Sequence, residues 1–281
     1  MINIINKFFK QNVNSEPIST GVIKLNNETQ VLKIFKSISN FSNEAELRYV
    51  GGCIRKILSN EEVDDIDLAT NLKPHEVCEV LKKNNISFYE SGIEHGTITA
   101  KINDHKFEIT SLRKDILTDG RHAKVEFSND WLEDASRRDF TFNSIYSDIN
   151  GNLFDPFNGK IDLEKGVVKF IGNAEKRIQE DYLRIFRYYR FLGCFKRINI
   201  IDGYEDIIIK HIPKIREYIN FDLMRNEILK MLKNKYAINS FIDINKPSDK
   251  NYLFKTISDL WNKEKYYLGI NKCMNFVDEY F

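Results

Sequence analysis

The stretch that decides the fold is residues 48–70, RYVGGCIRKILSNEEVDDIDLAT. Its β-rich start, Arg48–Val50, runs into the glycine pair Gly51-Gly52, after which the pattern becomes helical. A second short strand is expected at Ile66–Ala69, where β-branched and apolar residues return. A strand, a glycine turn, a helix and another strand in this order predict an α/β domain with helices on the face of a mixed sheet.

Two carboxylates flank the start of the second expected strand. Asp65 and Asp67 are i and i+2, so in a strand both side chains project from one face, about 6–7 Å apart along the backbone. Paired carboxylates that share a site with substrate phosphates form the usual Mg²⁺ site. The Asp-x-Asp spacing alone is a weak signal, because acidic surface strands are common.

The glycine pair upstream strengthens the prediction of a site. Glycines let the backbone approach a phosphate, and the N-terminus of the following helix supplies unpaired N–H groups and positive potential. Arg55, one turn into that helix, adds a cation. An element that grips a triphosphate beside an element that holds metal ions indicates nucleotidyl transfer. Glu108, on a later expected strand, is either a third carboxylate of this site or an exposed strand residue.

The rest of the chain supplies further elements of the domain. Residues up to about Phe41 read as a leader plus one amphipathic helix, and a helix is expected from Pro74 to about Asn84. A hairpin turn is expected at Asn103-Asp104. Further strands are expected at 86–89, 97–102, 106–112 and 167–171. We therefore divide the chain into a leader with an N-terminal helix (1–41), a catalytic head (42–172), a helical neck (173–235) and a short helical body (236–281).

The neck begins with a candidate recognition helix. One long helix is expected from Ala174 to about Phe195, capped by Asn173. Asp181 and Arg184 are then i and i+3 neighbours on its polar face, where an acceptor and a guanidinium donor can satisfy the edge of a base. The alternative is a solvated salt-bridge face, such as Glu180 with Arg184.

Several motifs in order resemble the class II tRNA nucleotidyltransferases, which comprise the CCA-adding enzymes and the bacterial poly(A) polymerases. The resemblance covers about residues 48–195. The matching motifs are Gly51-Gly52-x-x-Arg55 with Asp65-x-Asp67, Gly92-x-x-His95-Gly96-Thr97, Phe107–Thr110, Asp119-Gly120-Arg121, Arg137-Arg138-Asp139-Phe140-Thr141 and Glu180-Asp181-x-x-Arg184.

The resemblance implies a role for each motif. Two Mg²⁺ ions, for which Mn²⁺ can substitute, are held by Asp65 and Asp67, with Glu108 as the candidate third catalytic carboxylate. The nucleotide's sugar and phosphates are held by Gly51, Gly52, Arg55, Arg137, Arg138 and Asp139. Its base is read by Asp181 and Arg184, with Arg187 and Arg190 as further phosphate contacts. Head movement is coupled to nucleotide choice by Asp119, Gly120 and Arg121.

The implied activity is template-independent addition of C, C and A to the 3′ end of tRNA from CTP and ATP, with release of pyrophosphate. Addition of CC only, of A only, or of a poly(A) tail uses the same motifs and remains open, although an intact segment 114–125 favours an enzyme that adds the final A. From another class, the chain could be an RNA-binding module without catalysis. Intact Asp65, Asp67 and Asp181 argue against that alternative.

The composition agrees with a globular enzyme. The 281 residues carry 42 Lys and Arg against 41 Asp and Glu, a net charge of +1, and 42% are hydrophobic. This excludes a disordered chain, and no apolar stretch approaches the ~20 residues of a membrane helix. The four cysteines show no CxxC spacing, so a reducing, cytoplasmic location is expected.

Two features depart from the family pattern. Lys56 follows Arg55, where the family commonly has an acidic residue, and this change alters a local ion pair. The C-terminal part is also short for the family. Lys, Arg and aromatic residues after Tyr204 are then a reduced tRNA surface, or a partner supplies the rest of the grip.

Overall fold

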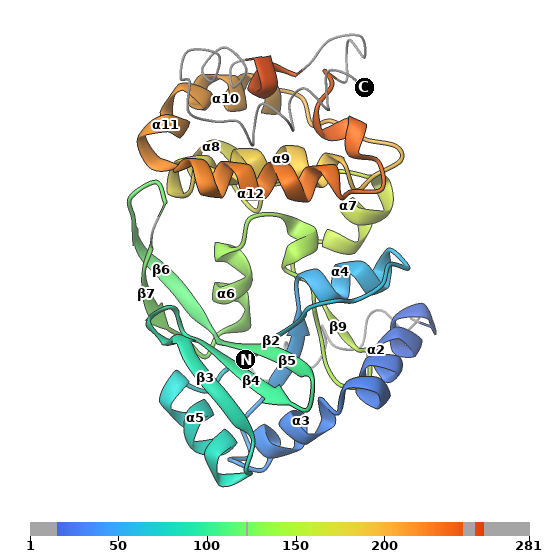
Figure 1. Cartoon of the computed structure of the whole chain (residues 1–281), viewed down its shortest axis with the longest axis vertical. Coiled ribbons are helices and arrows are strands. Elements are labelled where there is room, and N and C mark those ends of the chain that lie inside the picture. The colour runs from blue at the N-terminus through green and yellow to red at the C-terminus, as the bar shows by residue number, and fades with distance from the viewer. Residues whose placement is uncertain (1–15, 122, 244–250, 256–281) are drawn as a thin grey trace. The chain divides into compact units, whose positions relative to one another are not determined.

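The computed structural model describes residues 16–121, 123–243 and 251–255 (Figure 1). The chain divides into two compact units. Unit 1 contains Met1–Ile116 and Lys124–Leu163, and unit 2 contains Leu117–Ala123 and Glu164–Phe281. The leader expected near the N-terminus and most of the short C-terminal body lie outside the described residues, and the four-part division stays a prediction.

Unit 1 is built on a mixed sheet of seven strands in the order β3-β4-β5-β2-β1-β8-β9. Its central strands β2 and β5 are parallel, whereas the other neighbours are antiparallel. The strands are β1 (Leu47–Val50), β2 (Ile66–Thr70), β3 (Ser87–Gly92), β4 (Thr97–Ile102), β5 (His105–Ser111), β8 (Tyr146–Ser147) and β9 (Leu153–Phe154). The mixed sheet expected from the sequence is confirmed, although β8 and β9 are too short to leave a sequence pattern.

Helices cover the sheet of unit 1. The helices of this unit are α2 (Glu16–Thr29), α3 (Leu32–Ser39), α4 (Gly52–Leu58), α5 (Pro74–Lys83), α6 (Trp131–Arg137) and α7 (Gly159–Lys165), the last of which reaches into unit 2, with the 3₁₀ turns η1 (Ile93–His95) and η2 (Thr141–Asn143). Helix α5 starts where proline and a capping glutamate predict it: Glu76 accepts a hydrogen bond of 2.7 Å from the Lys73 backbone N–H. Helix α2 was not expected from the sequence, which indicated a single helix before Phe41.

The sheet and the N-terminal helices share one aromatic core. Tyr49 on β1 is fully buried, and its ring lies 5.0 Å from that of Phe35 on α3. Its hydroxyl donates a hydrogen bond of 2.6 Å to Asn26 Oδ1 on α2, which satisfies the buried polar atom. This packing fixes β1, whose end carries the glycine pair.

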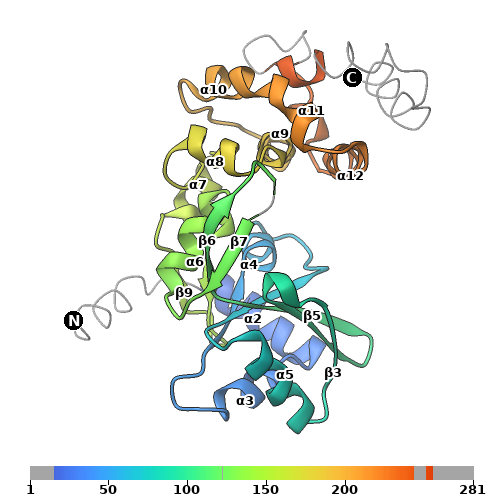
Figure 2. The ribbon, with the colours of Figure 1, turned by 90° about the vertical axis from the view of Figure 1, so that its left-hand side faces the viewer.

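A two-stranded hairpin, β6 (Arg113–Thr118) with β7 (Ala123–Phe127), follows β5 (Figure 2). The sequence analysis did not predict these strands. The hairpin starts in unit 1, but the residues of its tip, Leu117–Ala123, belong to unit 2. The tip contains Asp119-Gly120-Arg121, the segment expected to couple head movement to nucleotide choice.

Apart from the hairpin tip, the named elements that the structure describes in unit 2 are helices, which confirms the all-α C-terminal part. Its elements are α8 (Ala174–Glu180), α9 (Leu183–Leu192), α10 (Tyr204–His211), η3 (Ile212–Lys214), α11 (Ile215–Tyr218), α12 (Phe221–Leu232) and η4 (Ala237–Ser240). The strand expected at 167–171 is wrong, because this segment forms isolated bridges, at Val167 with Asn199 and at Phe170, and no continuous strand. Its apolar residues pack on aromatic rings instead: Phe170 is stacked on Tyr188, with centroids 6.0 Å apart.

The single long helix expected from Ala174 to about Phe195 is also wrong. The chain breaks at Asp181, whose φ of −154° and ψ of 105° are extended. The reason is a pairing that the sequence pattern does not reveal: Asp181 forms a parallel bridge with Gly120, and the Tyr182 backbone N–H donates to Gly120 O at 2.9 Å. The Asp181 carboxylate then accepts a hydrogen bond of 3.0 Å from the N–H of Leu183, the first residue of the new helix α9.

Candidate active site

The predicted carboxylates meet at the two parallel strands of unit 1. Asp67 on β2 is the register partner of Glu108 on β5, and Asp65 lies just before β2. Burial and the negative charges of Glu108 and Asp65 raise the pKa of Asp67 to about 6, although Arg138 and Arg55 oppose the shift. None of these three carboxylates forms an ion pair within the described ranges.

The donor set fits a hard divalent cation. Mg²⁺ takes one or two carboxylates and completes its coordination with water and substrate phosphates. Among the residues that the structure describes, no group of three His, Cys, Asp or Glu side chains is arranged to hold a metal by itself. Asp65 and Asp67 offer oxygen donors only, which fits the chemistry of such a cation, and their role as its ligands stays a prediction.

The glycine pair joins β1 to α4 next to Asp67. Gly51 has a φ of +66°, in the left-handed region that favours glycine. A Cβ on Gly51 would lie 3.4 Å from Asn143 O and 3.5 Å from Arg138 Nη1. A Cβ on Gly52 would lie 3.6 Å from Asp67 Oδ2. The turn thus brings backbone N–H groups, a guanidinium and a candidate metal ligand close together.

Arg55 and Asp139 belong to one hydrogen-bonded chain in unit 1. Arg55 donates through Nη1 to Asn143 Oδ1, and Asn143 Nδ2 donates to Asp139 Oδ1 at 2.9 Å. Asp139 is 7% exposed and also accepts the Phe140 N–H at 2.8 Å. Asn143 was missed in the sequence analysis, because a lone asparagine carries no spacing signal.

Asp134 organises the paired arginines. Its carboxylate, 1% exposed, accepts hydrogen bonds from Arg137 Nε at 2.9 Å, from Arg138 Nη2 at 3.0 Å and from the Tyr146 hydroxyl at 2.6 Å. Burial opposes ionisation, but the charges of Arg138 and Arg137 hold the pKa of Asp134 well below its usual range. Asp134 was not among the residues predicted from the sequence. Because both arginines are anchored on one buried carboxylate, their guanidiniums have defined positions.

In unit 2 the structure brings two predicted motifs together. Arg121 Nη1 donates to Asp181 Oδ2 at 3.1 Å, beside the backbone bridge of Asp181 with Gly120. Gly120 has a φ of +94°, and a Cβ there would lie 2.6 Å from Tyr218 Cδ1. Tyr218 is in turn stacked on Tyr182, with centroids 4.7 Å apart. Gly120 at the hairpin tip thus packs against the rings of Tyr218 and Tyr182, which leave no room for a larger residue.

Asp181 and Arg184 are not neighbours on one helix face. Asp181 has an extended backbone between α8 and α9, whereas Arg184 lies in the first turn of α9. Arg184 is 8% exposed and donates through Nη1 to Glu180 Oε2 at 2.7 Å and to Arg177 O at 2.9 Å. The alternative Glu180–Arg184 salt bridge is therefore present. It does not test the expected contact with a base, which stays a prediction.

The two arginines further along α9 contact the same aromatic ring. The guanidinium of Arg190 lies 4.6 Å from the Phe191 ring centroid, and that of Arg187 lies 5.7 Å from it. Arg190 also pairs with Glu227 of α12 at 2.8 Å, and Glu227 is 3% exposed. A buried partner gives Arg190 a packing role within unit 2, and its expected phosphate contact is untested.

Lys56 forms an ion pair with Asp64, the residue before Asp65. The side chain of Lys56 is 23% exposed and that of Asp64 is 69% exposed. The Lys56 ammonium holds the pKa of Asp64 below its usual range, mainly through their hydrogen bond. The unusual lysine therefore ties α4 to the segment that enters β2.

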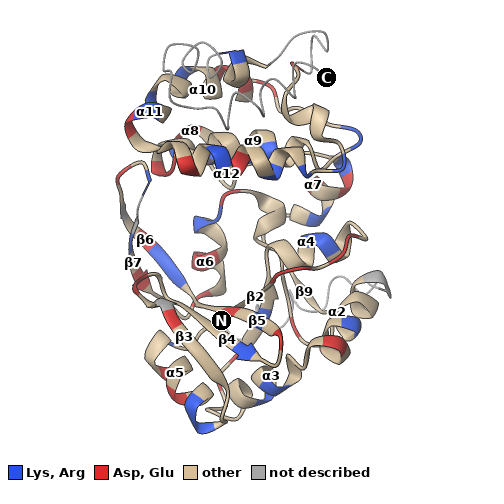
Figure 3. Cartoon of the chain, viewed as in Figure 1, with Lys and Arg blue, Asp and Glu red and all other residues tan. Residues whose placement is uncertain are grey.

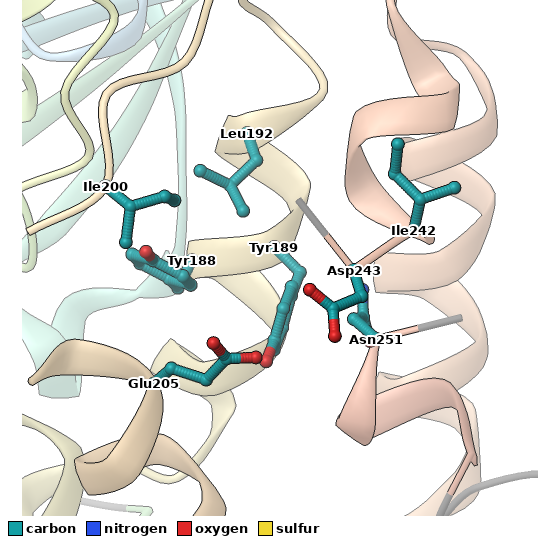
Figure 4. Close-up of a pocket in the computed structure, with 8 residues that line it drawn as sticks. All are labelled: Tyr188, Tyr189, Leu192, Ile200, Glu205, Ile242, Asp243 and Asn251. Carbon is teal, nitrogen blue, oxygen red and sulfur yellow. The ribbon is translucent and has the colours of Figure 1, made fainter. Parts of the chain in front are cut away.

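A small pocket in unit 2 is lined by none of these residues, although Tyr188 and Tyr189 stand between Arg187 and Arg190 in the sequence. It is lined by Tyr188, Tyr189, Leu192, Ile200, Glu205, Ile242, Asp243 and Asn251 (Figure 4). Burial and the charges of Asp243 and Asp206 raise the pKa of Glu205. Charged residues of both signs are spread over the two units (Figure 3), in agreement with the net charge of +1.

Comparison with known families identifies the sheet unit. Residues 47–169 match the family described as the poly A polymerase head domain. The mitochondrial CCA tRNA nucleotidyltransferase 1 of Mus musculus is 49% identical over 149 residues, which are 53% of this chain and 34% of that protein. A CCA-adding enzyme of Lactobacillus johnsonii is 34% identical over 213 residues, which are 74% of this chain and 52% of that protein. The chain thus spans between about a third and about half the length of these relatives.

A solved structure shows a similar arrangement. The Bacillus stearothermophilus CCA-adding enzyme in complex with CTP superimposes with a TM-score of 0.66 at 28% identity. The superposition covers 75% of this chain and 50% of that one. The Thermotoga maritima CCA-adding enzyme complexed with tRNA, at a TM-score of 0.62 and 22% identity, shows the same fold.

Proposed function

We propose that the protein, whose residues 47–169 match the poly A polymerase head domain, adds C, C and A to the 3′ end of tRNA without a template, from CTP and ATP. The observation that carries the proposal is the pairing of Asp67 with Glu108 on neighbouring parallel strands, beside the left-handed glycine turn at Gly51. Relatives named CCA tRNA nucleotidyltransferase and CCA-adding enzyme support this substrate choice.

The proposed chemistry needs no protein nucleophile. The RNA 3′-hydroxyl attacks the α-phosphate of the bound nucleotide in line, and pyrophosphate leaves. Asp65 and Asp67 hold the divalent cations, Mg²⁺ or Mn²⁺, with Glu108 as the third carboxylate. Bound divalent cations neutralise phosphate charge and lower the pKa of the attacking hydroxyl.

The remaining head residues bind the phosphates and the sugar of the nucleotide. The Gly51-Gly52 backbone and Arg55 take the triphosphate, since the turn leaves room for a close approach. Arg137 and Arg138 supply guanidiniums whose positions are fixed on Asp134. Asp139 accepts a hydrogen bond from Asn143, and Asn143 accepts one from Arg55. These contacts support a role for Asp139 in orienting Arg55 toward phosphate. A contact of Asp139 with the sugar stays a prediction.

Base choice is assigned to unit 2. The Asp181 carboxylate accepts a hydrogen bond from the exocyclic amino group that C and A share, and Arg184 donates to the neighbouring ring acceptor. In the structure these side chains bind Arg121 and Glu180. The nucleotide therefore exchanges with, or extends, these contacts. Arg187 and Arg190 stay candidates for phosphate binding.

Asp119, Gly120 and Arg121 link nucleotide choice to the hairpin. The tip is bound to Asp181 through one side-chain pair and one backbone bridge, so a shift of the hairpin also shifts the residue that reads the base. This contact supports the role in coupling that the sequence resemblance implies. No other assignment of the tip is needed for the reaction.

The described helices include none that is long and apolar enough to cross a membrane. The expected cytoplasmic location stays a prediction, since one relative is a mitochondrial protein by name. Addition of CC only, of A only, or of a poly(A) tail remains an alternative outcome of the same chemistry. An RNA-binding module without catalysis remains the alternative from another class.

The test uses three transcripts of one tRNA, ending before CCA, after C and after CC. Each is incubated with the protein, Mg²⁺ and labelled CTP, ATP or both, and the products are resolved at single-nucleotide resolution. Completion of CCA on the shortest transcript, followed by a stop, is expected. Addition of C alone or A alone indicates half of a split pathway, a long A ladder indicates a poly(A) polymerase, and RNA binding without pyrophosphate release contradicts the enzymatic proposal.

A further inference from the structure

Arg113, at the start of β6 in unit 1, carries a guanidinium with two buried nitrogens, Nε and Nη1, that have no hydrogen-bond partner in the described part of the chain. A guanidinium stays charged in proteins and has donors only, so burying two nitrogens whose N–H groups are unused costs free energy. The cost indicates an acceptor other than those that the described residues supply.

The carboxylate of Asp134, which lies near Arg113, already accepts hydrogen bonds from other side chains. Burial and the nearby guanidinium of Arg137 lower the pKa of Arg113 to about 10, while Asp115 and Asp134 partly compensate and Arg138 opposes them. Asp134 cannot serve as the missing acceptor, because its oxygens bind Arg137, Arg138 and Tyr146. Asp134 Oδ1 accepts a hydrogen bond of 3.3 Å from the backbone N–H of Arg113. The side-chain atoms Nε and Nη1 of Arg113 stay unsatisfied. The cluster therefore has an excess of positive charge and spare donors.

This cluster adjoins the glycine turn of the proposed site. Arg138, which shares Asp134 with Arg137, has its Nη1 atom 3.5 Å from the position of a Cβ on Gly51. Its charge also acts on Asp67. Asp134 and Arg138 thus link Arg113 to the turn that is proposed to hold the triphosphate, and all of these residues belong to unit 1. A phosphodiester of RNA offers the same phosphate oxygens, but the proposed function does not place one at the Gly51-Gly52 turn.

We propose that Arg113 is a further binding residue for the triphosphate of the nucleotide substrate, acting with Arg137 and Arg138 as a cluster of guanidiniums around Asp134. The proposal rests on the proposed function, which supplies the nucleotide. It adds a ligand contact on β6, a strand outside the motifs that the sequence analysis assigned to nucleotide binding. The basic start of β6 is visible in Figure 3.

The test compares Arg113→Gln and Arg113→Lys with the matched control Lys114→Gln. Lys114 is the next residue on β6, but its exposed side chain pairs with Glu126 at 3.1 Å. Calorimetry measures the affinity of the full chain for CTP and for inorganic triphosphate, and fluorescence anisotropy measures its affinity for a tRNA transcript. Thermal unfolding followed by circular dichroism checks that each variant is folded.

Arg113→Gln is expected to weaken binding of both CTP and inorganic triphosphate roughly 10- to 100-fold, the range for a hydrogen bond to a charged group. Arg113→Lys is expected to weaken it less, because an ammonium keeps the charge but not the fixed fork of donors. Affinity for the tRNA transcript and all values for Lys114→Gln are expected to match the wild type.

Unchanged triphosphate affinity in folded Arg113→Gln overturns the proposal. If that variant does not fold, wild-type affinity in Arg113→Lys overturns it instead. A loss confined to tRNA binding also overturns it and assigns the phosphate to RNA. Failure of the proposed function is distinguishable: the wild-type protein then binds triphosphate through Arg113 but incorporates no nucleotide.

Discussion

Arg121 and Asp181, 60 residues apart in the sequence, are joined at 3.1 Å at the point where α8 ends and α9 begins. One residue belongs to the hairpin tip and the other is the proposed base-reading carboxylate. The pair lies beside the Gly120–Asp181 bridge that breaks the helix, and it supports the expected dependence of nucleotide choice on the hairpin.

Removing the arginine is expected to relax nucleotide choice. In Arg121→Ala the Asp181 carboxylate loses its donor and is less well oriented, so the preference for CTP and ATP over UTP is expected to fall about 10-fold for the loss of a charged hydrogen bond. Competition between labelled nucleotides measures the ratio. Arg121→Lys, which keeps the charge, is the control, and an unchanged ratio in Arg121→Ala contradicts the coupling.

Asp65→Ala and Asp67→Ala are each expected to lower incorporation by roughly 1000-fold or more, since bound metal ions supply several kcal/mol of transition-state stabilisation. The measurement is single-turnover incorporation of labelled CMP across a range of Mg²⁺ concentrations. Glu62→Ala, an exposed acidic residue of the same segment, is the matched control. Full activity in both Asp variants would falsify the metal assignment.

Asp134→Asn is expected to lower the free energy of unfolding by about 3–5 kcal/mol, because it leaves two partly buried guanidiniums without their carboxylate. Tyr146→Phe, which removes one hydrogen bond to the same carboxylate, is expected to cost only about 1 kcal/mol. Urea unfolding measures both variants. Equal losses would mean that the ion pairs with Arg137 and Arg138 contribute little.

The same carboxylate predicts a pH dependence. Because the pKa of Asp134 is lowered in the folded state, its contribution to stability is fully present above the unfolded pKa of about 3.9 and is lost as the pH falls below it. The stability difference between the wild type and Asp134→Asn is therefore expected to shrink between about pH 4 and pH 2. Urea midpoints measured over this range test the sign, and a constant difference contradicts it.

The two glycines of the turn are expected to respond differently to alanine. Gly51→Ala forces a side chain into the left-handed region, at a cost of about 1–2 kcal/mol in stability. Gly52→Ala places a Cβ at an ordinary distance from Asp67 inside α4, so stability is expected to hold or to rise by about 0.5–1 kcal/mol. Its added methyl group nevertheless faces the proposed phosphate path, and CTP affinity is expected to fall. Unfolding curves and calorimetry separate the effects, and a Gly52→Ala protein that binds CTP normally argues against the path.

The sequence predicted the parts of the fold that local patterns encode. The glycine turn, the strand that carries Asp67 and helix α5 depend on residues that are neighbours in the chain, and each is found where it was expected. The mixed sheet with an all-α C-terminal part is confirmed in the described residues for the same reason.

The parts that could not be predicted depend on contacts between distant segments. The break at Asp181 comes from pairing with Gly120, and the apolar pattern at 167–171 comes from packing of Phe170 on Tyr188. Neither partner can be identified by periodicity. In the site, Asp134 and Arg113 were missed because their importance lies in hydrogen bonds made or left unmade, which no spacing records.

The divided chain of unit 2 has a consequence for synthesis on the ribosome. Unit 1 is complete once Leu163 has been made, but Gly120 at the hairpin tip packs on Tyr182 and Tyr218, which are made later. During that interval the hairpin tip lacks the tyrosine side chains against which Gly120 packs in the complete structure. The tip therefore acquires its full set of contacts, with Asp181, Tyr182 and Tyr218, only after Tyr218 has been made.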